Sequence, residues 1–151
     1  MIVRPSTEQL LLDCCKELMQ GVLPVVSDQT AVVRIFMIEQ VLRNAAVRCA
    51  HEIAWMDGEI PLIDSYARAV LQEAPREELA ALLGRLDDAE IGLDLDTVVE
   101  RYTRAGDVLA AALEIAVTDG PVELRRRGEQ LLEARHARET VVMAGWSPTG
   151  R

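Results

Sequence analysis

Glu133 and His136 form the motif of this sequence that most directly suggests metal chemistry. On a helix this Glu-x-x-His spacing puts both side chains on one face, and di-iron bundles use it twice, with a further Glu from each of two other helices. The motif occurs once here, because the other histidine, His51, is preceded at the same distance by Arg48. We therefore interpret Glu133 and His136 as surface residues and predict a protein without a metal site or a cofactor.

A second polar group is predicted to lie along one side of the longest helix. Asn44, Arg48 and His51 follow each other at steps of four and three residues, with Trp55 nearby, so they share a helical face. The strip is suited to lining a ligand cleft in which Arg48 pairs with a carboxylate or a phosphate. The alternative is the solvated side of a helix. An acid–base role would need a third group oriented by tertiary structure, so no catalytic residue is predicted.

The composition limits the classes of function. The 151 residues suit one domain, and 50% of them are hydrophobic, which is ample for a core. The net charge of −9 argues against nucleic acid, since phosphate binding needs a basic face. No apolar run reaches the roughly 18 residues of a membrane span, and no signal-peptide pattern is visible. Three cysteines, two of them adjacent, suggest free thiols and a cytoplasmic protein.

The stretch 28–57 is predicted to form the central helix of the fold. It contains no Gly or Pro, and a helix of about 30 residues is roughly 45 Å long. Gly58 is suited to end it as a left-handed C-cap, and Pro61 to begin the next helix. Apolar residues that recur in steps of three and four define its inward face: Ala31, Ile35, Ile38, Leu42, Ala45, Cys49, Ile53 and Met56.

Shorter helices are predicted before and after this one. Ser6 and Gln9 form a capping box for a first helix, which stops at Pro24 and points Cys15 inward. A short helical insertion is predicted between Pro61 and Leu86. Its inward residues are Leu62, Tyr66, Ala69, Val70, Leu79, Leu82, Leu83 and Leu86.

The C-terminal half is predicted to contain two longer helices. They cover residues 97–118 and 122–142, separated by Asp119-Gly120-Pro121, and Gly128 inside the second either permits a close helix crossing or weakens the helix. No segment alternates with period two. The sequence therefore predicts an all-α protein, a bundle of about four longer helices in a single domain of residues 1–144 with a tail at 145–151.

The first half of the central helix is apolar nearly all round. Val32, Val33, Phe36 and Met37 flank its inward stripe, and a helix that is apolar on every side must be covered on every side. We therefore predict a non-catalytic interaction protein that forms a homo-oligomer, most simply a dimer, through these four residues. The alternative function is a helical bundle that binds a small acyl or phosphate-bearing ligand.

Three short segments in the first third of the chain carry a resemblance to a known family. They are Arg4-Pro5-Ser6 with Glu8-Gln9-Leu10-Leu11, then Val22-Leu23-Pro24, then Arg34 through Arg43-Asn44-Ala45-Ala46-Val47. They resemble a family of small all-helical bacterial proteins of unknown function, often encoded beside acyl-CoA dehydrogenases and aminoglycoside-type phosphotransferases. The resemblance implies a cytoplasmic accessory protein, with one of those enzymes as a candidate partner, and it supplies no catalytic residues.

Overall fold

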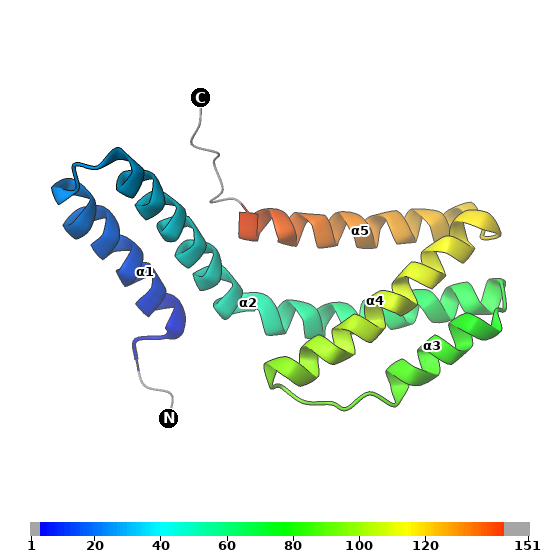
Figure 1. Cartoon of the computed structure of the whole chain (residues 1–151). Helices are drawn as coiled ribbons and strands as arrows, with labels where there is room; N and C mark the ends of the chain where they lie inside the picture. Colours follow the sequence, from blue (N-terminus) through cyan, green and yellow to red (C-terminus); the bar gives the residue numbers. More distant parts are fainter. Residues whose placement is uncertain (1–3, 144–151) are drawn as a thin grey trace. The chain divides into compact units, whose positions relative to one another are not determined.

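The computed structural model describes residues 4–143, which fold into five α-helices without a strand (Figure 1). The predicted all-α class is therefore confirmed. The chain forms two compact units: an N-terminal unit of residues up to Glu52 together with those from Ala137 onward, and a central unit, Ile53–His136. The predicted tail, residues 145–151, lies outside the described residues, and the single domain stays a prediction.

The N-terminal unit pairs α1 (Thr7–Glu17) with the first part of the long helix α2 (Figure 1). The predicted capping box is confirmed, because the Gln9 N–H donates to Ser6 Oγ at 3.2 Å and the Ser6 N–H donates to Gln9 Oε1 at 3.0 Å. A π-helical turn, η1 (Leu18–Val22), and a 3-10 turn, η2 (Leu23–Val25), follow α1. They reverse the chain, so that α2 runs back along α1.

One buried cysteine marks where the two helices of this unit touch. The Cys15 Sγ–H donates to the backbone carbonyl of Glu39 at 3.5 Å, and burial raises the pKa of the Cys15 thiol, with the Glu39 carboxylate adding to the rise. The prediction that Cys49 also points inward is wrong, since its side chain is exposed. The reason is the length of α1, which begins only eight residues before Cys15. Since Cys15 lies opposite Glu39 and the two helices are antiparallel, the first residue of α1 lies opposite residue 47 of α2, and α1 does not extend to Cys49.

α2 (Gln29–Glu73) is one continuous helix of 45 residues with Pro61 inside it. The predicted break at Gly58 and restart at Pro61 are therefore wrong, and no described glycine has a positive φ. A proline inside a helix costs about 3 kcal/mol. Burial of Ile60 and Ile63 on either side of it, at roughly 1.5–3 kcal/mol each, offsets that cost. Pro61 and Asp57 are exposed, so water can solvate the Asp57 carbonyl that the proline leaves without a donor.

The central unit combines the second part of α2 with α3 (Glu77–Asp87), α4 (Leu95–Thr118) and the start of α5 (Val122–Met143). Its core is one cluster of buried residues from all four helices: Ile60, Ile63, Tyr66, Ala67, Val70, Leu79, Leu83, Leu86, Ala105, Val108, Leu109, Ala112, Ala116 and Leu124. The prediction that Leu62 points inward is wrong, because it is half exposed whereas Ile63 is fully buried. Because α2 continues through Pro61, the side of α2 that packs against the other helices determines which residues are buried, and Leu62 does not lie on that side.

α5 packs closely against α2 and α4 at Gly128. A Cβ atom at this position would lie 2.6 Å from Leu113 Cδ2 on α4 and 2.7 Å from the hydroxyl of Tyr66 on α2. Only a glycine allows the three helices to approach so closely. This geometry favours the close-crossing interpretation of Gly128 over that of a weak point.

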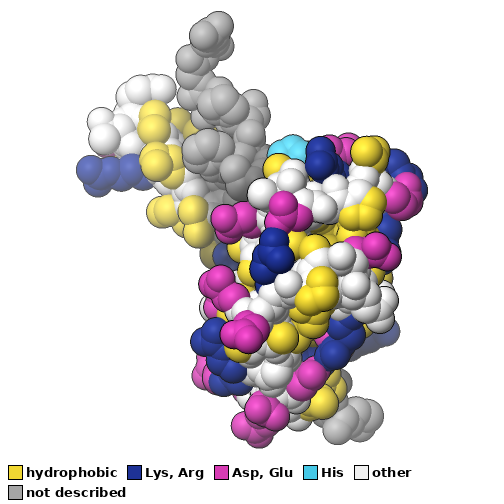
Figure 2. Space-filling view, turned by 90° about the vertical axis from the view of Figure 1, so that its right-hand side faces the viewer, with side chains coloured by type: hydrophobic (Ala, Val, Ile, Leu, Met, Phe, Trp, Pro, Cys, Tyr) yellow, Lys and Arg dark blue, Asp and Glu magenta, His cyan; other side chains and the backbone are white. Residues whose placement is uncertain are grey.

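The surface of the central unit mixes charges of both signs. In Figure 2, Asp and Glu side chains are interspersed with Arg side chains over the face turned to the viewer, with hydrophobic side chains between them. Such a surface offers no extended basic stripe on that face for a nucleic-acid backbone. Within residues 4–143, no helix has the length and apolar character needed to cross a membrane.

Candidate functional site

The predicted ligand strip on α2 has its cationic group already paired. Asn44 and Trp55 are half-buried, whereas Arg48 and His51 are exposed. Arg48 Nε lies 2.5 Å from the Glu52 carboxylate, one turn further along the helix. An incoming anion would compete with this carboxylate for the guanidinium. The geometry therefore adds no support to a ligand cleft at this strip, which stays a prediction.

An apolar face runs along the first half of α2, where the sequence predicted an interface. Val33, Met37 and Val41 lie one turn apart, and Phe36 and Ile38 flank them; all five are exposed, Met37 and Val41 to 65%. The prediction that Ile38 points inward is therefore wrong, because the packed side of α2 is the one that carries Ile35, Glu39 and Ala46. Val32, the remaining predicted interface residue, is half-buried. We call Val33, Phe36, Met37, Ile38 and Val41 the α2 apolar face.

The α2 apolar face points away from the side of the helix that packs in the N-terminal unit. Ile35, Glu39 and Ala46 are buried, and by helical periodicity they lie about half a turn of the helix from Met37 and Val41. Glu39 is compensated within this buried side by Arg43, whose Nε donates to its carboxylate at 2.9 Å. The helix is therefore apolar on two opposite sides, and α1 covers one of them.

A buried polar network in the central unit was not foreseen from the sequence. Glu59 on α2 is 5% exposed, and it accepts a hydrogen bond from the Tyr102 hydroxyl on α4 at 3.0 Å. Arg135 on α5 donates to the same hydroxyl at 3.0 Å, lies 3.3 Å from Glu59, and covers the Tyr102 ring at 5.1 Å from its centroid. Burial raises the pKa of Tyr102, and Glu59 adds to the rise, whereas Arg135 opposes it.

The network holds three helices together and offers no reactive group. The carboxylate is compensated by a guanidinium, and the hydroxyl is engaged on both sides, which is how buried polar groups are normally stabilised. One feature of the sequence indicated that Glu59 would be buried: it stands next to Ile60 and one helical turn before Ile63.

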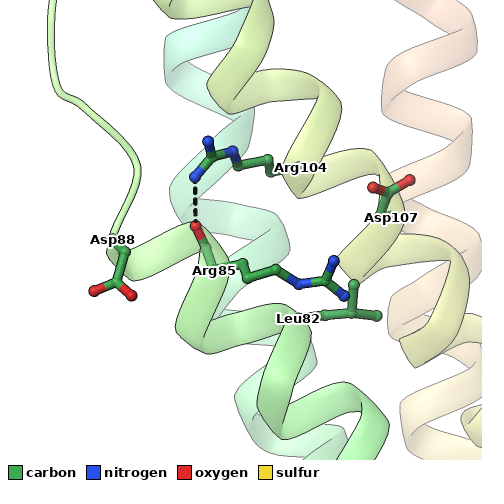
Figure 3. Close-up of a pocket in the computed structure, with 5 residues that line it drawn as sticks. All are labelled: Leu82, Arg85, Asp88, Arg104 and Asp107. Atoms are coloured by element: carbon green, nitrogen blue, oxygen red, sulfur yellow. Dashed lines mark hydrogen bonds between the residues drawn. The ribbon is translucent and has the colours of Figure 1, made fainter.

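A surface groove lies between α3 and α4 in the central unit. It has a volume of about 480 Å³ and is lined by Leu82, Arg85, Asp88, Arg104 and Asp107. Arg104 donates to the backbone carbonyl of Arg85 at 3.0 Å and pairs with Glu100. Asp88 points away from the two arginines (Figure 3). The charged groups do not converge on one point, so the groove is the ordinary charged surface of two neighbouring helices.

Neither half of the Glu-x-x-His motif is buried. Glu133 and His136 are exposed, and no group of three His, Cys, Asp or Glu side chains within residues 4–143 is arranged to hold a metal ion. Residues 1–3 and 144–151 contain none of these four residue types. Protein purified without chelator is expected to contain no stoichiometric iron, manganese or zinc. One or two metal ions per chain in elemental analysis would contradict this prediction.

Comparison of the chain with known protein families, curated proteins and solved structures finds no match. The resemblance of the first third of the chain to a bacterial family therefore stays a prediction.

Proposed function

We propose that this protein is a non-catalytic interaction protein that forms a homodimer through the α2 apolar face. The observation that carries the proposal is the exposure of Val33, Met37 and Val41 on the side of α2 opposite its packed side. Contiguous exposed apolar patches of this kind mark interaction sites in monomeric structures. A second copy of the same chain covers the face in the simplest way, since a two-fold axis places each patch against its equivalent.

The distribution of charge supports a second copy as the occupant. The whole chain has a net charge of −9, which opposes self-association. Residues 29–47 contain two arginines, Arg34 and Arg43, and one acid, Glu39, so their net charge is +1. Two copies that approach through this segment therefore meet less like-charge repulsion than they would through the acidic remainder of the chain.

Substitution of Val41 by glutamate is expected to weaken the dimer at least about tenfold. Each protomer would lose a buried side chain worth about 1.5 kcal/mol or more and gain a charge facing its symmetry mate. The dissociation constant is measured by sedimentation velocity or light scattering across micromolar concentrations. Wild-type protein is expected at twice the 16.7 kDa of one chain.

Val117→Glu is the matched control. Val117 lies on α4 and is also 65% exposed, so the substitution makes the same change of residue and charge outside the α2 apolar face. It is expected to leave the dimer unchanged. A wild-type protein that remains monomeric at micromolar concentration refutes the proposed function, and equal weakening by Val41→Glu and Val117→Glu would place the interface elsewhere.

A further inference from the structure

The Tyr66 hydroxyl is buried without a hydrogen-bond partner among the described residues. Tyr66 is 1% exposed, and its oxygen neither donates nor accepts within residues 4–143. Buried polar groups in native proteins are almost always satisfied, and one that is not calls for a water, an ion or a ligand. Burial raises the pKa of Tyr66, so the hydroxyl is protonated at neutral pH and available as a donor.

The same tyrosine forms part of the wall of a cavity of about 230 Å³ between α2 and α5. The other residues that line it are Leu62, Ser65, Arg127, Gln130 and Leu131. Leu62 and Gln130 are exposed, so the cavity opens to the surface. All six residues lie in the central unit, within Ile53–His136.

The cavity has the composition of an anion site. Of its polar residues, Ser65, Tyr66 and Gln130 are neutral and Arg127 is cationic, so no carboxylate lines it. This is notable in a chain with 25 acidic residues. Leu62 and Leu131 supply an apolar wall.

Arg127 differs from its neighbours on α5 in having no assigned partner. Arg126 pairs with Glu123 at 2.6 Å, and Arg125 donates to the Ala116 carbonyl at 3.1 Å. The structure gives the Arg127 guanidinium no hydrogen bond or ion pair within the part of the chain that it describes, and its positive charge acts on the Tyr66 hydroxyl and on the Glu123 carboxylate, which is hydrogen-bonded to Arg126. A half-buried guanidinium that is not hydrogen-bonded, near an unsatisfied hydroxyl, is an arrangement that can recognise an oxyanion.

We propose that this cavity binds a small oxyanion, a carboxylate or a phosphate carried on a short apolar group, which accepts hydrogen bonds from Tyr66 and Arg127. The apolar group lies against Leu62 and Leu131. Binding needs a small movement of the cavity wall, because the hydroxyl has almost no accessible surface. The site is separate from the α2 apolar face and does not depend on dimerisation.

Titration of the full-length, ¹⁵N-labelled protein tests the proposal with two probes, sodium phosphate and sodium butyrate. The readout is the side-chain Nε–Hε resonance of Arg127, with sodium chloride at equal ionic strength as the reference. A saturable shift with either probe is expected. Saturation by phosphate alone assigns the site to phosphates, and saturation by butyrate assigns it to carboxylates with an apolar chain.

Two variants and one control locate the binding. Arg127→Gln and Tyr66→Phe are each expected to raise the dissociation constant of the probe by about tenfold or more. Arg126→Gln changes the neighbouring arginine, which does not line the cavity, and is expected to leave binding unchanged. Tyr66→Phe removes only an oxygen that has no partner in the protein, so it is not expected to lower the melting temperature of the probe-free protein.

Three results would overturn the proposal. If neither probe produces a saturable shift at millimolar concentration, the cavity does not bind an oxyanion, and a water molecule is the partner of the Tyr66 hydroxyl. Equal weakening by Arg126→Gln would indicate unspecific binding to the α5 arginines. A lower melting temperature of Tyr66→Phe without any probe would show that the hydroxyl is satisfied inside the protein. Because all these variants leave the α2 apolar face intact, none of these outcomes bears on the dimer.

Discussion

Arg135→Met is expected to destabilise the protein by about 3 kcal/mol. The substitution preserves the aliphatic part of the side chain and removes the guanidinium that compensates Glu59, a carboxylate that is only 5% exposed. It also removes a hydrogen bond to the Tyr102 hydroxyl and the cation that covers the Tyr102 ring. The free energy of unfolding is measured by urea titration followed by circular dichroism.

Arg101→Met is the control for this prediction. Arg101 also joins α4 to α2, but its partner Asp57 is exposed and lies 3.4 Å away. A surface pair of this kind contributes about 0–1 kcal/mol. Adding Glu59→Gln to Arg135→Met should recover part of the lost stability, since the double variant no longer buries an uncompensated acid. If Arg135→Met costs no more than Arg101→Met, the network does not stabilise the central unit.

Gly128→Val is expected to destabilise the protein by about 2–3 kcal/mol. The new Cβ atom alone would lie 2.6 Å from Leu113 Cδ2 and 2.7 Å from the Tyr66 hydroxyl, and the two methyl groups of valine add further volume at the crossing. Overpacking of a close-packed core costs typically 1–3 kcal/mol, whereas the gain in helix propensity over glycine is a few tenths. Urea unfolding again measures the difference.

Gly106→Val, on α4, tests whether the loss comes from the crossing. A Cβ atom at Gly106 meets nothing within 4 Å, so this variant is expected to stay within about 0.5 kcal/mol of wild type. Equal effects of the two substitutions would mean that α5 does not pack at Gly128 as the structure describes. Gly128→Ala is expected to fall between the two, because its smaller clash is partly offset by its larger gain in helix propensity.

Local chemistry made several features of the fold predictable from the sequence. The Ser6 and Gln9 capping box, for example, satisfies backbone groups within a few residues of itself. The apolar periodicity of α3 likewise identified residues that are buried, such as Leu79 and Leu83. The two-sided apolar character of α2 was also visible in the sequence, because it depends only on helical spacing.

Other features required contacts between residues far apart in the chain. Gly58 and Pro61 usually end a helix, yet α2 continues through them because Ile60 and Ile63, on either side of Pro61, are buried in the core. Cys49 fits the inward stripe by its spacing but is exposed, because α1 is too short to reach it. Propensity and periodicity describe one segment at a time, and tertiary packing overrides them where burial is worth more.

The candidate sites divide in the same way. Helical spacing showed that Asn44, Arg48 and His51 share a side of α2, since this follows from 3.6 residues per turn. It did not decide which apolar side of α2 is packed, because Ile38 was assigned to the inward stripe and is half exposed. Only the tertiary structure brought together Glu59, Tyr102 and Arg135 from three helices, and placed Arg127 beside the buried Tyr66 hydroxyl. The physical reason is that burial of a polar group, and the partner that compensates it, are properties of packed helices and not of any single stretch of chain.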